Sequence, residues 1–246
     1  MKILTPIKRV PDPDQKFHAA PDGRSLDLAV VPHVVNYFDA IALEEAVRIR
    51  EKSENAAVEI VAVGIGGADY QEQLRTALAV GADRAVLVSA PDPLDPWNVA
   101  TVLAAMVKKE QPSFVLMGKQ AVDDDSNQAG QFLAAQLNWP QATFASEIDL
   151  QEGRAKVARE TDQGIEVVTV ELPAVITVDL RLNEPRYASL PSILKAKKKP
   201  IEEVSVEDLG IALQPRVRVL RTCVEESQRK CIRVANVQEL IAALDL

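Results

Sequence analysis

Residues 57–90, which read AVEIVAVGIGGADYQEQLRTALAVGADRAVLVSA, decide the fold class of this chain. The stretches Ala57–Ile65 and Arg84–Ala90 are short and apolar, which is typical of buried strands. The stretch Asp69–Val80 between them is amphipathic and predicts a helix. Two strands joined by a helix in this way form a βαβ unit, in which the strands run parallel.

The same alternation extends to both sides of this unit. Further strands are predicted at Lys2–Val10 and Ser113–Gly118. Further helices are predicted after the capping residue Asn36, at Pro96–Glu110, and from near Ser126 to Asn138. Because strands alternate with helices of this length, we expect an α/β fold with a doubly wound, mainly parallel sheet.

The pattern changes after Thr143. Arg154–Glu160 and Ile165–Glu171 are joined by a short turn sequence with a glycine, and together they predict a β-hairpin. Ala174–Val178 predicts a short buried strand that rejoins the main sheet. We expect one α/β domain over residues 1–210 and an irregular C-terminal arm over 211–246, which ends in a helix at Val237–Leu246.

The composition narrows the class of protein. The chain has 246 residues, enough for one large domain with an extension, and a formal net charge of −8. This charge argues against nucleic acid as the main partner, since such binding depends on neutralising phosphates. No apolar run reaches the roughly 18 to 20 residues of a membrane span. The N-terminal residues predict a strand rather than a targeting signal, so we expect a cytoplasmic protein, with the mitochondrial matrix as the alternative.

Histidine and cysteine are scarce. The chain contains Cys223, Cys231, His18 and His33 and no others. The cysteine spacing matches no zinc pattern, and two histidines do not suggest a metal site. We therefore expect two ordinary thiols, no metal ligands, and no catalytic residues of the Ser/His/Asp or Cys/His kind.

Three loops follow the ends of predicted strands, where open α/β sheets bind their ligands. They are Lys8–Gln15, Gly64–Gly67 and Gly118–Gln128. The glycines of the second loop would let a ligand approach the backbone or simply make a turn, and they match neither GxGxxG nor the P-loop pattern.

The third loop carries the strongest local signal. Residues 118–131 read GKQAVDDDSNQAGQ, follow an apolar strand and open a predicted helix, whose free N–H groups favour an anion. The aspartates Asp123–Asp125 allow three interpretations: they cap the helix, bind Mg²⁺, or accept hydrogen bonds from ribose hydroxyls while Ser126–Gln128 face a phosphate. The sequence thus offers a nucleotide site without an evident catalytic set.

A basic stretch interrupts this acidic chain. Residues 178–200, VDLRLNEPRYASLPSILKAKKKP, contain six basic and two acidic residues and are predicted to leave the sheet as a long loop. Tyr187, Leu190 and Ile193 form an apolar patch within it, and prolines restrict its backbone on either side of Leu190. The stretch is either a docking loop for an acidic partner surface or a loop packed on its own sheet.

Several long motifs resemble the β subunits of electron-transfer flavoproteins. They are the loop 118–131, RLNEPRYASLPSILKAKKK at 181–199, NYFD at 36–39 with EEAVRIREK at 44–52, RTALAVGADRAV at 75–86 and LNWPQATFAS at 137–146. The resemblance covers residues 1 to about 210. It implies an adenine-nucleotide α-hydrolase-like fold, a heterodimer with an α subunit that holds most of one FAD, and an AMP buried in the β subunit. The flavin then supplies the redox chemistry.

The resemblance also implies partners and site residues. Electrons come from acyl-CoA or related dehydrogenases and pass to a membrane quinone oxidoreductase, and Phe38 lies close to the flavin. The arm over 211–246 contacts the α subunit. Docking belongs to a recognition segment over 183–199, with Leu190 as its anchor beside Tyr187, Ile193, Lys195, Lys197 and Lys198. The AMP contacts implied are Pro6, Asn36, Tyr37, Phe38, Asp39, Val63, Gly118, Lys119, Gln120, Ala121, Val122, Asp123, Asp124, Asp125, Ser126, Asn127, Gln128 and Ala129.

Some positions depart from the family pattern, and alternatives remain. Ala129 stands where threonine is frequent, and Tyr37 where proline is frequent. An electron-bifurcating branch carries a second FAD in place of AMP, but the side chain of Asp124, where that branch has glycine, narrows the pocket and favours AMP. A stand-alone stress-type nucleotide-binding protein would need a glycine-rich phosphate motif, and an ATP-pyrophosphate-cleaving enzyme an SGGxDS-like loop; the chain has neither.

Overall fold

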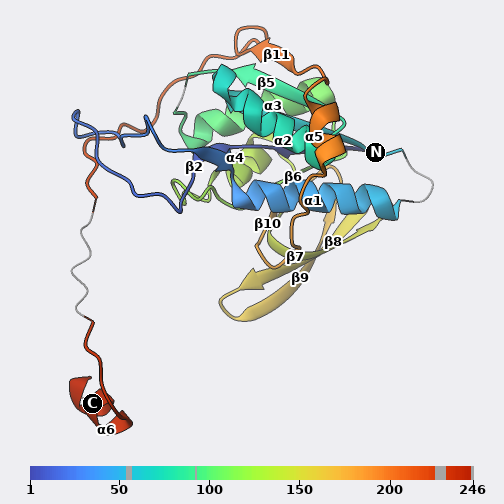
Figure 1. Ribbon diagram of the computed structural model, residues 1–246. Coiled ribbons are helices and arrows are strands. Elements are labelled where there is room, and N and C mark those ends of the chain that lie inside the picture. The colour runs from blue at the N-terminus through green and yellow to red at the C-terminus, as the bar shows by residue number, and fades with distance from the viewer. Residues whose placement is uncertain (54–56, 92, 225–230, 245–246) are drawn as a thin grey trace. The chain divides into compact units, whose positions relative to one another are not determined.

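The computed structural model describes residues 1–53, 57–91, 93–224 and 231–244 (Figure 1). The chain divides into two compact units. The larger unit, called the α/β body below, comprises Met1–Lys16 and Ala29–Arg218. The smaller unit comprises Phe17–Leu28 and Val219–Leu246, and in it Thr222 donates its backbone N–H to the carbonyl of Gly23.

The α/β body is built on one large sheet. Within the described residues, its nine strands lie in the order β11-β5-β4-β1-β6-β10-β7-β8-β9. Neighbours from β11 to β7 run parallel, whereas β7, β8 and β9 are antiparallel. The bounds are β1 Lys2–Pro6, β4 Glu59–Gly66, β5 Arg84–Ser89, β6 Phe114–Gly118, β7 Gln141–Gln151, β8 Arg154–Thr161, β9 Gly164–Glu171, β10 Val175–Val178 and β11 Glu202–Ser205.

Helices cover both faces of the parallel part of this sheet. One hydrophobic cluster packs α1 and α2 with Ala196 of α5 against one face, and a second packs α3 and α4 against the other. The bounds are α1 Tyr37–Lys52, α2 Gln71–Val80, α3 Pro96–Glu110, α4 Ala129–Leu137 and α5 Leu190–Ala196, with α6 Val237–Ala243 in the smaller unit. The prediction of a doubly wound α/β fold is confirmed, as are the β8–β9 hairpin and the return of β10 to the sheet.

Two predicted boundaries were wrong: in one the chain leaves the main sheet for a second sheet, and in the other positive φ values delay a helix. The first strand ends at Pro6, and Arg9–Pro11 forms β2, which pairs with β3 (His33–Val35) in a separate two-stranded sheet. The predicted helix from Ser126 begins only at Ala129, since Asp125 and Asn127 adopt φ values of 48° and 50°, outside the range of an α-helix.

Besides β3, three elements were not predicted from the sequence. The strand β7 was missed because Phe144 has a φ of 61° and the register shifts nearby, so burial does not alternate regularly over its first half. The edge strand β11 has only four residues. The basic stretch is not a loop throughout: its middle forms α5, which Ser189 caps by accepting a hydrogen bond from the N–H of Ser192. The predicted final helix is α6, which ends at Ala243; residues 245–246 lie outside the described residues.

The α/β body extends to Arg218 because α3 holds the chain after β11. The side-chain amide of Asn98 bonds reciprocally to the backbone of Gln214, at 2.9 and 3.2 Å. The backbone N–H of Arg216 donates to Asp95, the N-cap of α3. The guanidinium of Arg216 lies 4.2 Å from the ring centre of Trp97. Among the described residues, no helix is long and apolar enough to span a membrane.

Candidate functional site

The predicted nucleotide-binding residues meet at the carboxyl ends of three neighbouring strands. Val63 of β4 pairs in register with Pro6 of β1, and β1 lies between β4 and β6, which ends at Gly118. Asn36 and the first residues of α1 lie at the same edge, where they contact the segments that leave β1 and β6. The structure therefore brings together residues that are up to 116 positions apart in the chain. Their role in nucleotide binding stays a prediction.

The side chain of Asn36 does not cap α1, although its position at the start of the helix suggests a cap. Asn36 is the N-cap residue of α1, but its side chain makes no capping hydrogen bond. Instead its Nδ2 donates to the carbonyl of Gln120 at 2.9 Å, and its Oδ1 accepts the N–H of Val122 at 3.2 Å. Asn36 is only 1% exposed. The loop over 118–129, called the nucleotide loop below, is thus fastened to the start of α1.

Asp39 joins the exits of two strands through one buried carboxylate. Its Oδ2 accepts the N–H of Lys8 at 2.8 Å, and its Oδ1 accepts the N–H of Gly118 at 3.1 Å. Burial raises the pKa of Asp39 to about 7, although the N–H groups of Lys8 and Gly118 and the side chain of Asn36 act in the opposite direction. A Cβ on Gly118 would lie 2.5 Å from Oδ1 of Asp39, so glycine is required for this close approach.

The aspartates of the nucleotide loop do not cap α4. The N-cap of α4 is Gln128, without a side-chain capping bond, so the capping interpretation was wrong. Asp123 and Asp124 bind the ammonium of Lys8 at 2.7 and 3.0 Å, and Asp125 accepts a hydrogen bond from Gln120. Within the described ranges, no three acidic, histidine or cysteine side chains gather in an arrangement suited to a metal ion.

The far end of the nucleotide loop carries an acceptor without a partner. Gln131, in the first turn of α4, donates from Nε2 to Oδ1 of Asn127 at 3.0 Å. Its Oε1 is buried and accepts no hydrogen bond from the part of the chain that the structure describes. A buried acceptor in this state costs free energy unless a donor reaches it, and a ribose hydroxyl or an adenine amino group would be such a donor. The residues predicted to bind the nucleotide end at Ala129 and do not include Gln131.

Phe38 and Tyr37 differ in their surroundings. Phe38 is 5% exposed, and the ammonium of Lys119 lies 5.3 Å from the centre of its ring. Tyr37 is 41% exposed. Partial desolvation of the hydroxyl, together with the charges of Asp14 and Asp12, raises the pKa of Tyr37. Of the two neighbours, Tyr37 is therefore the one that presents much of its side chain to solvent.

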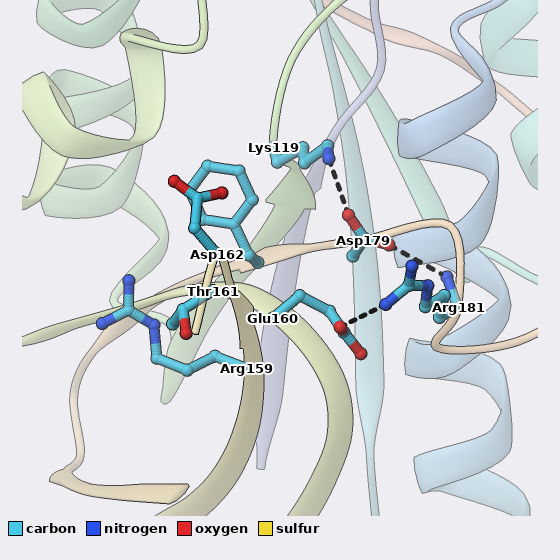
Figure 2. A pocket seen from close by; sticks show the side chains of 8 residues that line it. Lys119, Arg159, Glu160, Thr161, Asp162, Asp179 and Arg181 are labelled. Carbon is cyan, nitrogen blue, oxygen red and sulfur yellow. Dashed lines mark hydrogen bonds and ion pairs between the residues drawn. The ribbon is translucent and has the colours of Figure 1, made fainter. Parts of the chain in front are cut away.

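A polar cavity of about 490 Å³ adjoins the nucleotide loop, and the sequence analysis missed it apart from Lys119 (Figure 2). The Lys119 ammonium bonds to Asp179 at 2.6 Å and lies 5.0 Å from the ring centre of Phe144, and Arg181 pairs with Glu160. No local sequence signal could reveal this cavity, since its walls come from four separate segments of the chain. They are lined by Lys119, Phe144, Arg159, Glu160, Thr161, Asp162, Asp179 and Arg181.

The recognition segment over 183–199 is anchored at both ends. Arg186 binds the buried Glu44 at 2.7 Å and Glu51 at 2.6 Å, both from α1. Burial alone would raise the pKa of Glu44, but hydrogen bonds from Arg186 and Arg48 hold it below its usual value. Lys199 donates to the carbonyl of Ala82 at 3.0 Å. The backbone of the segment is thus fixed to the α/β body.

The predicted docking side chains of this segment point to solvent. Tyr187, Leu190 and Ile193 are 98%, 69% and 38% exposed, and Lys195, Lys197 and Lys198 are exposed as well. Packing on the protein's own sheet explains the anchors but leaves these apolar side chains uncovered. The arrangement is that of a fixed support that presents an apolar patch with a basic margin.

The protonation of Asp39 predicts how stability depends on pH. In the folded chain this carboxyl binds its proton below about pH 7, whereas the unfolded chain loses it near the ordinary value of 3.8. Between these values the folded state binds more protons, so stability should fall as pH rises, by at most about 1.4 kcal/mol per pH unit for this group. We expect urea unfolding from pH 4.5 to 7.5 to show this component in the wild type and not in Asp39→Asn. Equal slopes in both proteins would contradict it.

Comparison with known proteins agrees with this geometry. The model of the electron transfer flavoprotein domain family matches residues 27–209. The electron transfer flavoprotein subunit beta of Bradyrhizobium diazoefficiens is 48% identical over 244 residues, which cover 99% of this chain and 97% of that protein. The mitochondrial subunit beta of Oryza sativa subsp. indica is 47% identical, with the same coverage. The subunit beta of Homo sapiens is 45% identical, over 99% of this chain and 96% of that protein.

These matches define the class as a flavoprotein of electron transport. The chain belongs to the electron transfer flavoprotein family. The relatives named above are β subunits of electron transfer flavoproteins.

Proposed function

We propose that this chain is the β subunit of an AMP-containing, non-bifurcating electron transfer flavoprotein. It pairs with an α subunit, helps to hold the FAD of that subunit, and has no catalytic residues of its own. It docks acyl-CoA-type or related flavin dehydrogenases, from which electrons pass through the flavin to a membrane quinone oxidoreductase. Its compartment is the cytoplasm, with the mitochondrial matrix as the alternative.

The observation that carries this proposal is the nucleotide loop at the joint edge of β4, β1 and β6. Asn36 and Asp39 fasten the loop and its neighbours from the start of α1. The Oε1 of Gln131, which accepts no hydrogen bond from the described residues, supplies an acceptor for a bound nucleotide. The side chain of Asp124 already contacts Lys8 and the N–H of Ser126, which leaves less room for a dinucleotide and favours AMP.

Features of the arm over 211–246 favour the proposal that the chain binds an α subunit. Its first residues are held on α3 through Asn98 and Asp95. From Val219 onward it exposes large apolar side chains, which a partner chain would cover. In the described part of the arm these are Val219, Leu220, Val224, Ile232, Val237, Leu240, Ile241 and Leu244.

The nucleotide content of the purified protein tests this function. We expect the chain alone to be colourless and to release about one equivalent of AMP when denatured. The heterodimer that forms with the co-expressed α subunit is expected to contain one FAD and one AMP. Quantitative nucleotide chromatography after denaturation measures both. Two FAD and no AMP per heterodimer would assign the protein to the electron-bifurcating branch. Failure to form a heterodimer with the co-expressed α subunit would exclude the proposed function.

A further inference from the structure

Lys8, which was predicted only as the first residue of a loop, connects three parts of the candidate site. Its N–H donates to Oδ2 of Asp39 at 2.8 Å, and its carbonyl accepts the N–H of Asn36 at 3.0 Å. Its neighbour Ile7 donates to the carbonyl of Val63 at 2.8 Å. The backbone of Lys8 is therefore fixed between β4 and the start of α1.

The side chain of Lys8 reaches the nucleotide loop from this fixed backbone. Its ammonium lies 2.7 Å from Oδ1 of Asp123 and 3.0 Å from Oδ2 of Asp124. Among the described residues, these are the ion pairs that the two aspartates form. The ammonium of Lys119, a lysine of the nucleotide loop itself, is bound to Asp179 instead. Burial alone would lower the pKa of Lys8, but the two carboxylates outweigh it and raise the pKa.

The loop needs this cation for an electrostatic reason. Three consecutive aspartates repel one another, and they also repel the phosphate of a bound nucleotide. Asp124 accepts the N–H of Ser126 at 2.9 Å, immediately before Asn127, whose φ is 50°. Holding Asp124 therefore also holds the left-handed turn that leads into α4.

We propose that Lys8 is a positioning residue that keeps the nucleotide loop closed on its ligand and so controls how fast the nucleotide leaves. This inference rests on the proposed function, because it takes AMP as the ligand. Lys8 acts through Asp123 and Asp124, and its fixed backbone gives the ion pairs a firm support.

The rate of AMP release tests this role. Heterodimer loaded with radiolabelled AMP is mixed with excess unlabelled AMP, and the label that stays bound is followed in time. We expect Lys8→Met to release AMP about tenfold faster than the wild type, which lies within the range that two partly exposed ion pairs supply. The difference should shrink in high salt, which screens such pairs. Lys8→Arg keeps the positive charge and should release AMP at a rate close to that of the wild type.

Controls separate this role from loss of folding. Lys52→Met removes an exposed lysine at the end of α1 and should leave the release rate unchanged. If Lys8→Met does not assemble, Asp123→Asn and Asp124→Asn weaken the same contacts from the loop side and should each speed release. In the double variant Lys8→Met/Asp123→Asn, the two effects should not add.

The outcomes distinguish this inference from the proposed function. A wild-type heterodimer without AMP overturns both. A wild type that retains AMP, together with Lys8→Met or the aspartate variants releasing it at the wild-type rate, overturns only the role of Lys8. Faster release in Lys8→Met that is fully additive with Asp123→Asn would place the action of Lys8 elsewhere and overturn it as well.

Discussion

Replacing Leu190 by alanine should lower the affinity for the donor dehydrogenase by about one to two decades. Burying one leucine side chain contributes about 1.5 to 3 kcal/mol, and each 1.4 kcal/mol is about tenfold in affinity. Leu190 is 69% exposed in this chain, so its truncation removes little internal packing. Flavin reduction at limiting dehydrogenase concentration should slow accordingly, while AMP content, FAD content and melting temperature stay close to the wild type.

The control for this prediction is a leucine of similar exposure outside the recognition segment. Leu180 is 55% exposed and lies two residues after the end of β10. Leu180→Ala should leave dehydrogenase-dependent reduction unchanged. Normal reduction in Leu190→Ala, or a large fall in its melting temperature, would show that Leu190 is not a docking anchor. Reversing charge with Lys197→Glu separates affinity from steering, since its effect should fall mainly on the association rate and disappear in high salt.

Replacing Gly118 by alanine should destabilise the α/β body by about 3 kcal/mol and abolish retention of AMP, since overpacking of a buried site costs about 1 to 3 kcal/mol. The added Cβ would lie 2.5 Å from Oδ1 of Asp39, 2.7 Å from Cβ of Phe38 and 3.0 Å from the backbone nitrogen of Asp39. None of these is the free end of a flexible side chain, because Asp39 is held by Lys8 and Gly118 itself. Urea unfolding and AMP content measure the two effects.

Gly153 provides the matched control for the substitution of Gly118. It has a φ of 71°, and a Cβ there would meet no atom within 4 Å. Gly153→Ala should therefore cost only the strain of a left-handed alanine, about 1 kcal/mol, and leave AMP bound. If Gly118→Ala is no less stable than Gly153→Ala, the start of α1 can move away from β6, and the rigid support described for the nucleotide loop is wrong.

Local signals in the sequence were sufficient for most elements of the fold. The helix α3 was predicted at Pro96–Glu110 and lies there, because Asp95 caps its first turn and a proline occupies its first position. The hairpin β8–β9 was found from its turn and its alternating strands. These features depend on residues a few positions apart, and such interactions form in the same way in many tertiary contexts. The long motifs of the family could be read for the same reason, as continuous stretches of sequence.

The contacts that build the site were decided by the tertiary structure alone. The sequence assigned Asn36 to a helix cap, yet its side chain bonds to residues 84 and 86 positions away, and Lys8 finds its carboxylates 115 and 116 positions away. Hydrophobic periodicity reports which face of a segment is buried, but it does not report which distant segment packs against that face. The sheet order places β1 between β4 and β6, and only this order brings the ends of the three strands, and hence the polar groups that follow them, into one site.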